Sequence, residues 1–196
     1  SLPQRPVSLK SRQDFLPYVQ RLDSRCTDDI CLVVIHCTEL PDMAMARVYG
    51  ERIHYPEKQT GNSGHFYIDR DGRIEQWVPL SRIAHHVRGF NPQSIGIELV
   101  NNGRYPDWFK SGHQLMSEPY PDLQINALVS LLNHLQSEIK GLQHIAGHED
   151  LDTGMIPSED KPEIMIRRKL DPGLLFPWSG LMKQIPLQRL MAPSQD

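Results

Sequence analysis

Residues 31–38, CLVVIHCT, form a short, β-branched and apolar run with His36 near its end. A run of this length is too short for a typical helix and is typical of a buried strand. A second run of this kind, SIGIELVN, occupies residues 94–101, and a third, QHIA, occupies residues 143–146 and leads toward His148. Strands of this kind predict a sheet whose core strands are buried on both faces.

The segment HFYIDRDGRIEQWVP, residues 65–79, predicts a β-hairpin. Its two strand candidates, residues 66–70 and 73–78, flank Asp71-Gly72, which is a strong hairpin turn signal. Because strand and helix signals alternate along the chain, we expect an α/β fold, namely a single domain with a central mixed β-sheet flanked by helices.

The clearest helix signal covers residues 122–139, where leucine and isoleucine recur at helical spacing. Asp122 is expected to cap this helix and Gly141 to end it. Two weaker helix signals, at residues 13–22 and 174–185, each contain a proline. These helices are expected to flank the sheet.

The length of the chain allows one substantial core. It has 196 residues, 39% of them hydrophobic and 23% charged, which is short of what two domains usually need. We expect residues 1–30 to form an N-terminal arm that packs on the domain, residues 31–182 to form the domain, and residues 183–196 to form a C-terminal tail.

Charge and hydropathy exclude several classes of protein. The net charge of −3 leaves no basic excess to bind phosphates, so we expect no nucleic-acid partner. The longest apolar run, residues 32–35, is far below the ~20 residues of a membrane span, so we expect no membrane-spanning segment.

The three cysteines, at positions 26, 31 and 37, cannot all pair within the chain, which excludes a disulfide framework but allows a single bridge. The compartment therefore stays open.

Three side chains in or directly after the predicted strands could carry chemistry: His36, Glu98 and His148. His36 and His148 each end a predicted strand of one sheet, where open α/β sheets place their ligand sites. Glu98 lies inside an apolar strand, and a carboxylate is costly there unless it is paired, bonded to a functional water or partly exposed in a cleft. The alternative for Glu98 is the solvent face of an edge strand. Cys37 should face the core, because neighbours on a strand point to opposite faces. Asp171, in an Asp-Pro-Gly turn motif, would carry no functional signal by itself.

Five segments, in one order, resemble the AmpD-like, zinc-dependent N-acetylmuramoyl-L-alanine amidases, whose fold is shared with the peptidoglycan recognition proteins. They are LVVIHCT, SGHFYIDRDGRIEQWVP, SIGIELVN, IAGHED and KLDPG. The resemblance covers about residues 31–178. Five segments in the family order are far more specific than any one of them.

The resemblance implies one zinc ion per chain, held by His36, His148 and Asp171. Two neutral imidazoles and one carboxylate leave a fourth tetrahedral position open, which is typical of catalytic zinc. It also implies that Glu98 is the acid/base residue and that Lys169 is the cation beside the scissile carbonyl, where one oxyanion donor is typically worth ~3 kcal/mol. The implied reaction hydrolyses the amide between the lactyl group of N-acetylmuramic acid and L-alanine of the stem peptide, in peptidoglycan or its muropeptide fragments.

Two stretches depart from the family pattern. The link that follows His148 is long, and we expect its segment DTGMIPSEDKPEIMIRR, residues 152–168, to bulge over the cleft and influence substrate choice. Where many relatives have Trp-His-Ala-Gly, this chain has HHVRG at residues 85–89. His86 then matches the usual histidine and is a candidate for substrate binding, while His85 replaces the aromatic residue.

Two other functions are also compatible with the sequence. One is a non-catalytic peptidoglycan-binding module of the same fold, although such relatives usually lack a metal ligand. The other is a structural domain with unrelated histidines, against which the five ordered segments argue. The sequence does not decide between polymeric peptidoglycan and a soluble anhydro-muropeptide, between bacterial cytoplasm and cell envelope, or between oligomeric states.

Overall fold

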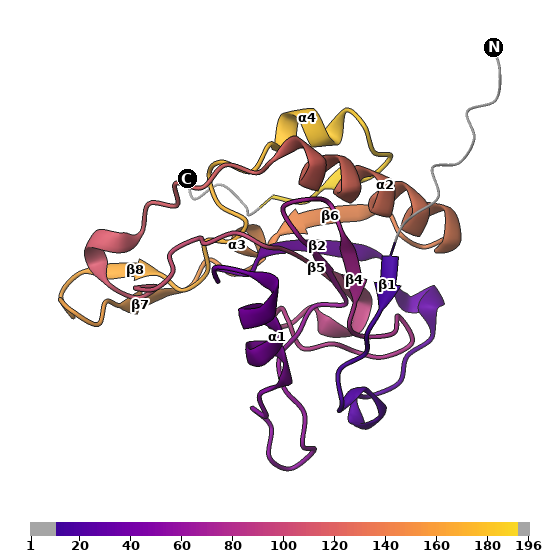
Figure 1. Cartoon of the computed structure of the whole chain (residues 1–196), viewed down its shortest axis with the longest axis horizontal. Coiled ribbons are helices and arrows are strands. Elements are labelled where there is room, and N and C mark those ends of the chain that lie inside the picture. The colour runs from indigo at the N-terminus through magenta and orange to yellow at the C-terminus, as the bar shows by residue number, and fades with distance from the viewer. Residues whose placement is uncertain (1–10, 192–196) are drawn as a thin grey trace.

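The described residues of the computed structural model form a seven-stranded mixed sheet (Figure 1). The structure describes residues 11–191, so residues 1–10 of the expected arm and 192–196 of the expected tail lie outside the described residues. The strand order is β1-β4-β3-β5-β2-β6-β9. The strands are β1 (Ser11–Gln13), β2 (Leu32–Cys37), β3 (Phe66–Ile68), β4 (Ile74–Gln76), β5 (Ser94–Leu99), β6 (His144–Gly147) and β9 (Gln188–Arg189).

The three apolar runs of the sequence are β2, β5 and β6, and they lie side by side in the middle of this sheet. β2 pairs in parallel with both β5 and β6. β3 and β4 form the predicted hairpin and are the antiparallel pair of a sheet whose other pairings are parallel. The α/β class and the mixed sheet are therefore confirmed. Because β5 lies between β3 and β2, the edge-strand alternative for Glu98 was wrong.

Helices cover both faces of the sheet (Figure 1). α2 (Asp122–Glu138) and α4 (Trp178–Met182) lie over one face, and α1 (Met43–Glu51) lies over the other. One apolar cluster joins α2 and α4 to the central strands, and a second joins α1 and the segment 16–22 to the opposite face around Trp77. The short α3 (His148–Leu151) follows β6 directly.

The predicted helix ends were wrong in detail. α2 begins at Asp122 itself, so Asp122 lies inside the helix and is not its cap. The N-cap is Pro121, whose backbone is extended, and no side chain caps the helix. It ends at Glu138, before Gly141, because the backbone at Ile139 is extended.

The two weaker helix predictions were largely wrong. Residues 11–13 of the N-terminal segment form β1, whose backbone pairs with β4, and only a 3₁₀ turn at Val19–Arg21 follows. The expected helix at 174–185 is reduced to α4, which begins directly after Pro177 because proline lacks a backbone donor and is tolerated only where a helix starts.

The long link after His148 folds as a separate two-stranded hairpin. β7 (Met155–Pro157) pairs antiparallel with β8 (Met165–Arg167), and the hairpin lies beside the main sheet (Figure 1). We call residues 155–167 the side hairpin. Its influence on substrate choice stays a prediction.

The cysteines are all free thiols. Cys26 and Cys31 are exposed and Cys37 is buried, so the structure does not contain the single bridge that the sequence allowed. Among the described residues, no helix combines the length and the hydropathy that a membrane span requires.

Candidate active site

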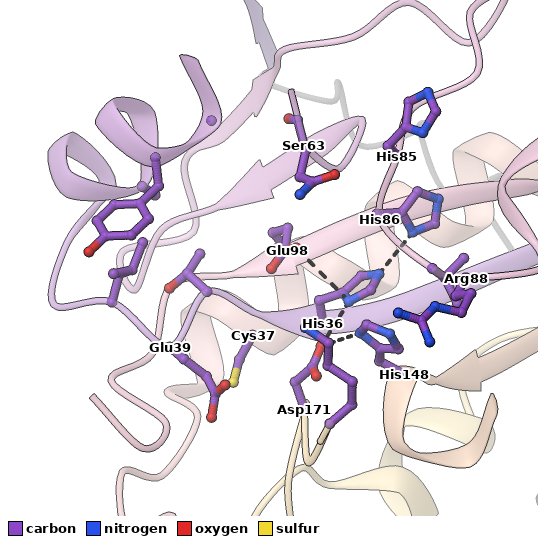
Figure 2. A pocket seen from close by; sticks show the side chains of 18 of the residues that line it. His36, Cys37, Glu39, Ser63, His85, His86, Arg88, Glu98, His148 and Asp171 are labelled. Carbon is purple, nitrogen blue, oxygen red and sulfur yellow. Dashed lines mark hydrogen bonds and ion pairs between the residues drawn. The ribbon is translucent and has the colours of Figure 1, made fainter. Parts of the chain in front are cut away.

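The candidate site lies where the central parallel strands end (Figure 2). His36 of β2 is in register with Glu98 of β5, so the two residues are neighbours on adjacent strands. Ile35 is in register with Gly147 of β6, which places His148 beside the same end of β2. The carboxyl ends of neighbouring parallel strands meet at one edge of a sheet. Local strand patterns therefore bring together three side chains that are far apart in the sequence.

Asp171 completes the cluster from the loop that follows β8 (Figure 2). Its Oδ2 lies 2.8 Å from His36 Nδ1 and 3.2 Å from His148 Nδ1. One ligand atom from each of these residues lies within 4.8 Å of the others, and all three residues are at most 5% exposed. Two ring nitrogens and one carboxylate oxygen thus converge on one point.

The protonation of this cluster suits metal binding. Burial lowers the pKa of His36 to about 4, so its ring is neutral at physiological pH. Burial alone would raise the pKa of Asp171, but contacts with His148 and His36 hold it well below its usual range. Metal ligands must be deprotonated. His36 and Asp171 offer their donor atoms in that form.

Glu98 faces the same point from β5. Its Oε1 lies 3.9 Å from His36 Nδ1, and its side chain is 16% exposed. Its Oε2 is buried and has no hydrogen-bond partner among the described residues. Burial and the negative charge of Asp171 raise the pKa of Glu98 well above its usual range, while the charge of Lys169 opposes this effect. A carboxyl group in this environment has the features of a functional acid or base.

These residues line an open cleft of about 700 Å³. Lys169, two residues before Asp171, also lines it. Arg88 and Arg168 add further positive charge, although Arg168 is paired with Asp152. Aromatic side chains line other parts of the cleft wall: Tyr49, Tyr55, Tyr67, Trp108 and Phe109.

His86 contacts His36 rather than standing apart in the cleft. Its Nδ1 lies 2.9 Å from His36 Nε2 (Figure 2), and its Nε2 lies 3.1 Å from Ser94 Oγ. A Cβ at Gly96 would lie 2.7 Å from the His86 ring, so this glycine allows the ring to rest against β5. Since His86 also lines the cleft, its predicted contact with substrate stays a prediction. His85 lies beside Tyr55, with 4.8 Å between their ring centroids.

Two residues that line the cleft, Glu39 and Arg104, were not predicted from the sequence. Glu39 follows the end of β2, and Arg104 lies in the loop after β5. They form an ion pair in which Arg104 Nε donates to Glu39 Oε1 at 2.8 Å, and Arg104 is only 4% exposed. The only sequence signal for either residue is that Glu39 places a charge directly after the apolar run at residues 31–38.

The sequence profile of the family described as N-acetylmuramoyl-L-alanine amidase matches residues 27–174. The N-acetylmuramoyl-L-alanine amidase AmiD of Escherichia coli is 35% identical over 122 residues, which cover 57% of this chain and 38% of AmiD. The chain therefore spans well under half the length of that relative. The 1,6-anhydro-N-acetylmuramyl-L-alanine amidase AmpD of Haemophilus influenzae is 27% identical over 179 residues, which cover 80% of this chain and 83% of AmpD.

A solved structure of E. coli AmiD has a similar fold. Its TM-score is 0.60 at 26% sequence identity, and the match covers 80% of this chain and 57% of that one. AmiD is bound there to the substrate anhydro-N-acetylmuramic acid-L-Ala-D-gamma-Glu-L-Lys.

Proposed function

Because the chain belongs to the N-acetylmuramoyl-L-alanine amidase family, we propose that it hydrolyses the amide bond between the lactyl group of N-acetylmuramic acid and L-alanine of the stem peptide, with one zinc ion per chain. The observation that carries this proposal is the convergence of His36, His148 and Asp171 on one point, within 4.8 Å, beside the carboxyl group of Glu98 on an open cleft. A recognition module that only binds would not need this acid/base group.

The donor set fits zinc. Two imidazole nitrogens and one carboxylate oxygen are the ligands of catalytic zinc sites, which keep a further position open. Zinc bound by His36, His148 and Asp171 would supply a water molecule that loses its proton near pH 7. His86 supports this arrangement, because a His36 ring that donates its Nε2–H to His86 keeps the lone pair of Nδ1 for the metal.

We assign the proton transfers to Glu98. Its carboxylate accepts a proton from the attacking water and returns it to the nitrogen of L-alanine as the amide bond breaks. The unpartnered Oε2 is free to make these hydrogen bonds. Lys169, whose charge acts on both Glu98 and His36, stabilises the negative charge that develops on the lactyl carbonyl oxygen.

The cleft suits a muropeptide. Its volume of about 700 Å³ is within the range of sites that enclose a ligand of this size. The γ-linked glutamate of a stem peptide such as the one bound to AmiD carries a free α-carboxylate. Arg88 provides positive charge for such a group. The proposed substrate is therefore a fragment that contains muramic acid and a stem peptide.

Elemental analysis of purified protein tests the metal site. We expect about one zinc per chain in the wild type and a loss of zinc and activity in His148→Ala and Asp171→Ala. His134→Ala, which changes an exposed histidine of α2, is the matched control and should keep both. Full zinc content and full activity in His148→Ala would show that the site is misassigned. Tight muropeptide binding without cleavage by the zinc-loaded wild type would favour the recognition module.

A further inference from the structure

The ion pair between Glu39 and Arg104 lies next to the site and is held by more than one hydrogen bond. Arg104 Nε and Nη2 donate to the two carboxylate oxygens of Glu39, at 2.8 and 3.1 Å. Such bidentate pairs are stronger and more directional than single contacts. Arg104 is 4% exposed, so bulk water screens this pair little.

Arg104 also holds the backbone of the segment that leads to Asp171. Its Nη1 donates to the carbonyl oxygen of Arg167 at 3.0 Å, and its Nη2 donates to that of Arg168 at 3.3 Å. Lys169 follows directly. One guanidinium group therefore joins the end of β2, which carries His36, to the segment that carries Lys169 and Asp171.

The loop around Arg104 packs closely against Glu39. A Cβ at Gly103, whose φ is +53°, would lie 2.4 Å from Glu39 Cγ. Glu39 itself has a φ of +52°, a conformation that is uncommon for residues other than glycine. Trp108 Nε1 donates to the Glu39 carbonyl oxygen at 2.8 Å. The surrounding contacts thus stabilise Glu39 in an unfavourable backbone conformation in which its carboxylate contacts Arg104.

The far end of the side hairpin is fastened separately. Ser111 donates to Asp160 through both its backbone N–H and its hydroxyl, each at 2.8 Å, and Glu159 N donates to the Phe109 carbonyl oxygen at 2.8 Å. Removing the contacts of Arg104 should therefore loosen the base of the side hairpin and leave its tip in place.

From this geometry we propose that Glu39 and Arg104 are positioning residues, which together hold residues 167–171 so that Lys169 and Asp171 face His36. The roles of Lys169 and Asp171 in this statement rest on the proposed function. The fixing of the segment does not, because it concerns only contacts within the chain. No group of the pair is required to touch the substrate.

Arg104→Lys tests the proposal, because lysine keeps the charge but cannot reproduce the planar fork or donate to both carbonyl groups at once. Arg70→Lys is the matched control. Arg70 pairs with both carboxylate oxygens of Glu118, at 2.7 and 3.0 Å, away from the cleft. Both variants should be compared with the wild type in the zinc-loaded form, by hydrogen exchange with mass spectrometry, by zinc affinity in competition with a chelator, and by kcat and KM on a muropeptide.

We expect Arg104→Lys to raise amide exchange at residues 167–171 but not at 155–165, to weaken zinc binding about tenfold and to lower kcat about tenfold, with KM within threefold of the wild type. Arg70→Lys should leave all four unchanged. Unchanged exchange at 167–171, or faster exchange with normal zinc affinity and kcat, would overturn the proposal. If Arg104→Lys does not fold, Glu39→Gln should show the same pattern with smaller changes, and its absence would be equally decisive against the proposal. If the wild type neither binds zinc nor cleaves the muropeptide, the proposed function fails, and the exchange data alone then decide whether the pair holds the segment.

Discussion

Replacing Glu98 with glutamine changes the proposed acid/base group and little else. The two side chains have nearly the same shape, so the packing of β5 should be preserved. The carboxyl group lies 3.9 Å from His36 Nδ1 and is not one of the three converging donors, so zinc should stay bound. The variant therefore separates proton transfer from metal binding.

The proposed acid/base role of Glu98 sets the size of the expected effect. A positioned acid or base typically contributes 10²–10⁴-fold to the rate, so Glu98→Gln should lower kcat at least about 100-fold, which is roughly 2.7 kcal/mol in activation free energy. Stability should not fall, because the charged form of Glu98 is opposed by burial and by Asp171, as its raised pKa shows. A neutral amide avoids both costs, so the thermal midpoint should be equal to that of the wild type or higher.

The assay measures release of stem peptide from a muropeptide, with zinc content and thermal midpoint determined on the same samples. Glu149→Gln is the control. Burial and the nearby charges of Asp150 and Asp171 raise the pKa of Glu149 to about 7. Glu149, however, does not line the cleft. It should keep kcat within about threefold. A Glu98→Gln enzyme with more than a tenth of the wild-type kcat, or one that has lost its zinc, would refute the assignment.

Three further changes have expected outcomes. Lys169→Ala should lower kcat about 100-fold and change KM much less, because its charge matters most when the oxyanion forms, and an equal change in both would contradict that role. Removing zinc with a chelator should lower the thermal midpoint and abolish activity, and added zinc should restore both, since a ligand at 100 times its Kd stabilises the folded state by about 2.7 kcal/mol. Contacts with Arg70 and Asn102 outweigh burial and lower the pKa of Glu118 below its ordinary 4.5, so Glu118 adds stability above pH 4.5 that is lost as the pH falls through its folded-state pKa. The urea midpoints of the wild type and Glu118→Gln should therefore differ at pH 7 and converge in acid, and a constant difference would show that the charge of Glu118 is not responsible.

The central part of the site could be predicted because local patterns carry it. Each of His36, Glu98 and His148 lies in or directly after a buried strand, and parallel strands in one sheet place their carboxyl ends together. Asp171 is different, because Asp-Pro-Gly by itself predicts only a turn. The family resemblance, and not the local pattern, singled it out.

Other features depend on contacts that no local pattern encodes. Glu39 and Arg104 are 65 residues apart in the sequence and meet only once β2 and β5 are paired. The side hairpin was missed because its strands, β7 and β8, have three residues each and no hairpin turn signal between them. The strand β1 was missed because its pairing with β4 is a long-range contact.

The bond that is cleaved tests the account most directly. Purified, zinc-loaded protein should be incubated with a muropeptide that contains muramic acid and a stem peptide, and the products identified by mass spectrometry. We predict intact stem peptides with a free L-alanine amino terminus, together with muramic acid that has lost its peptide, and no new reducing sugar ends. Cleavage within the peptide or between sugars, or no cleavage by a protein that binds the muropeptide and holds its zinc, would contradict the account.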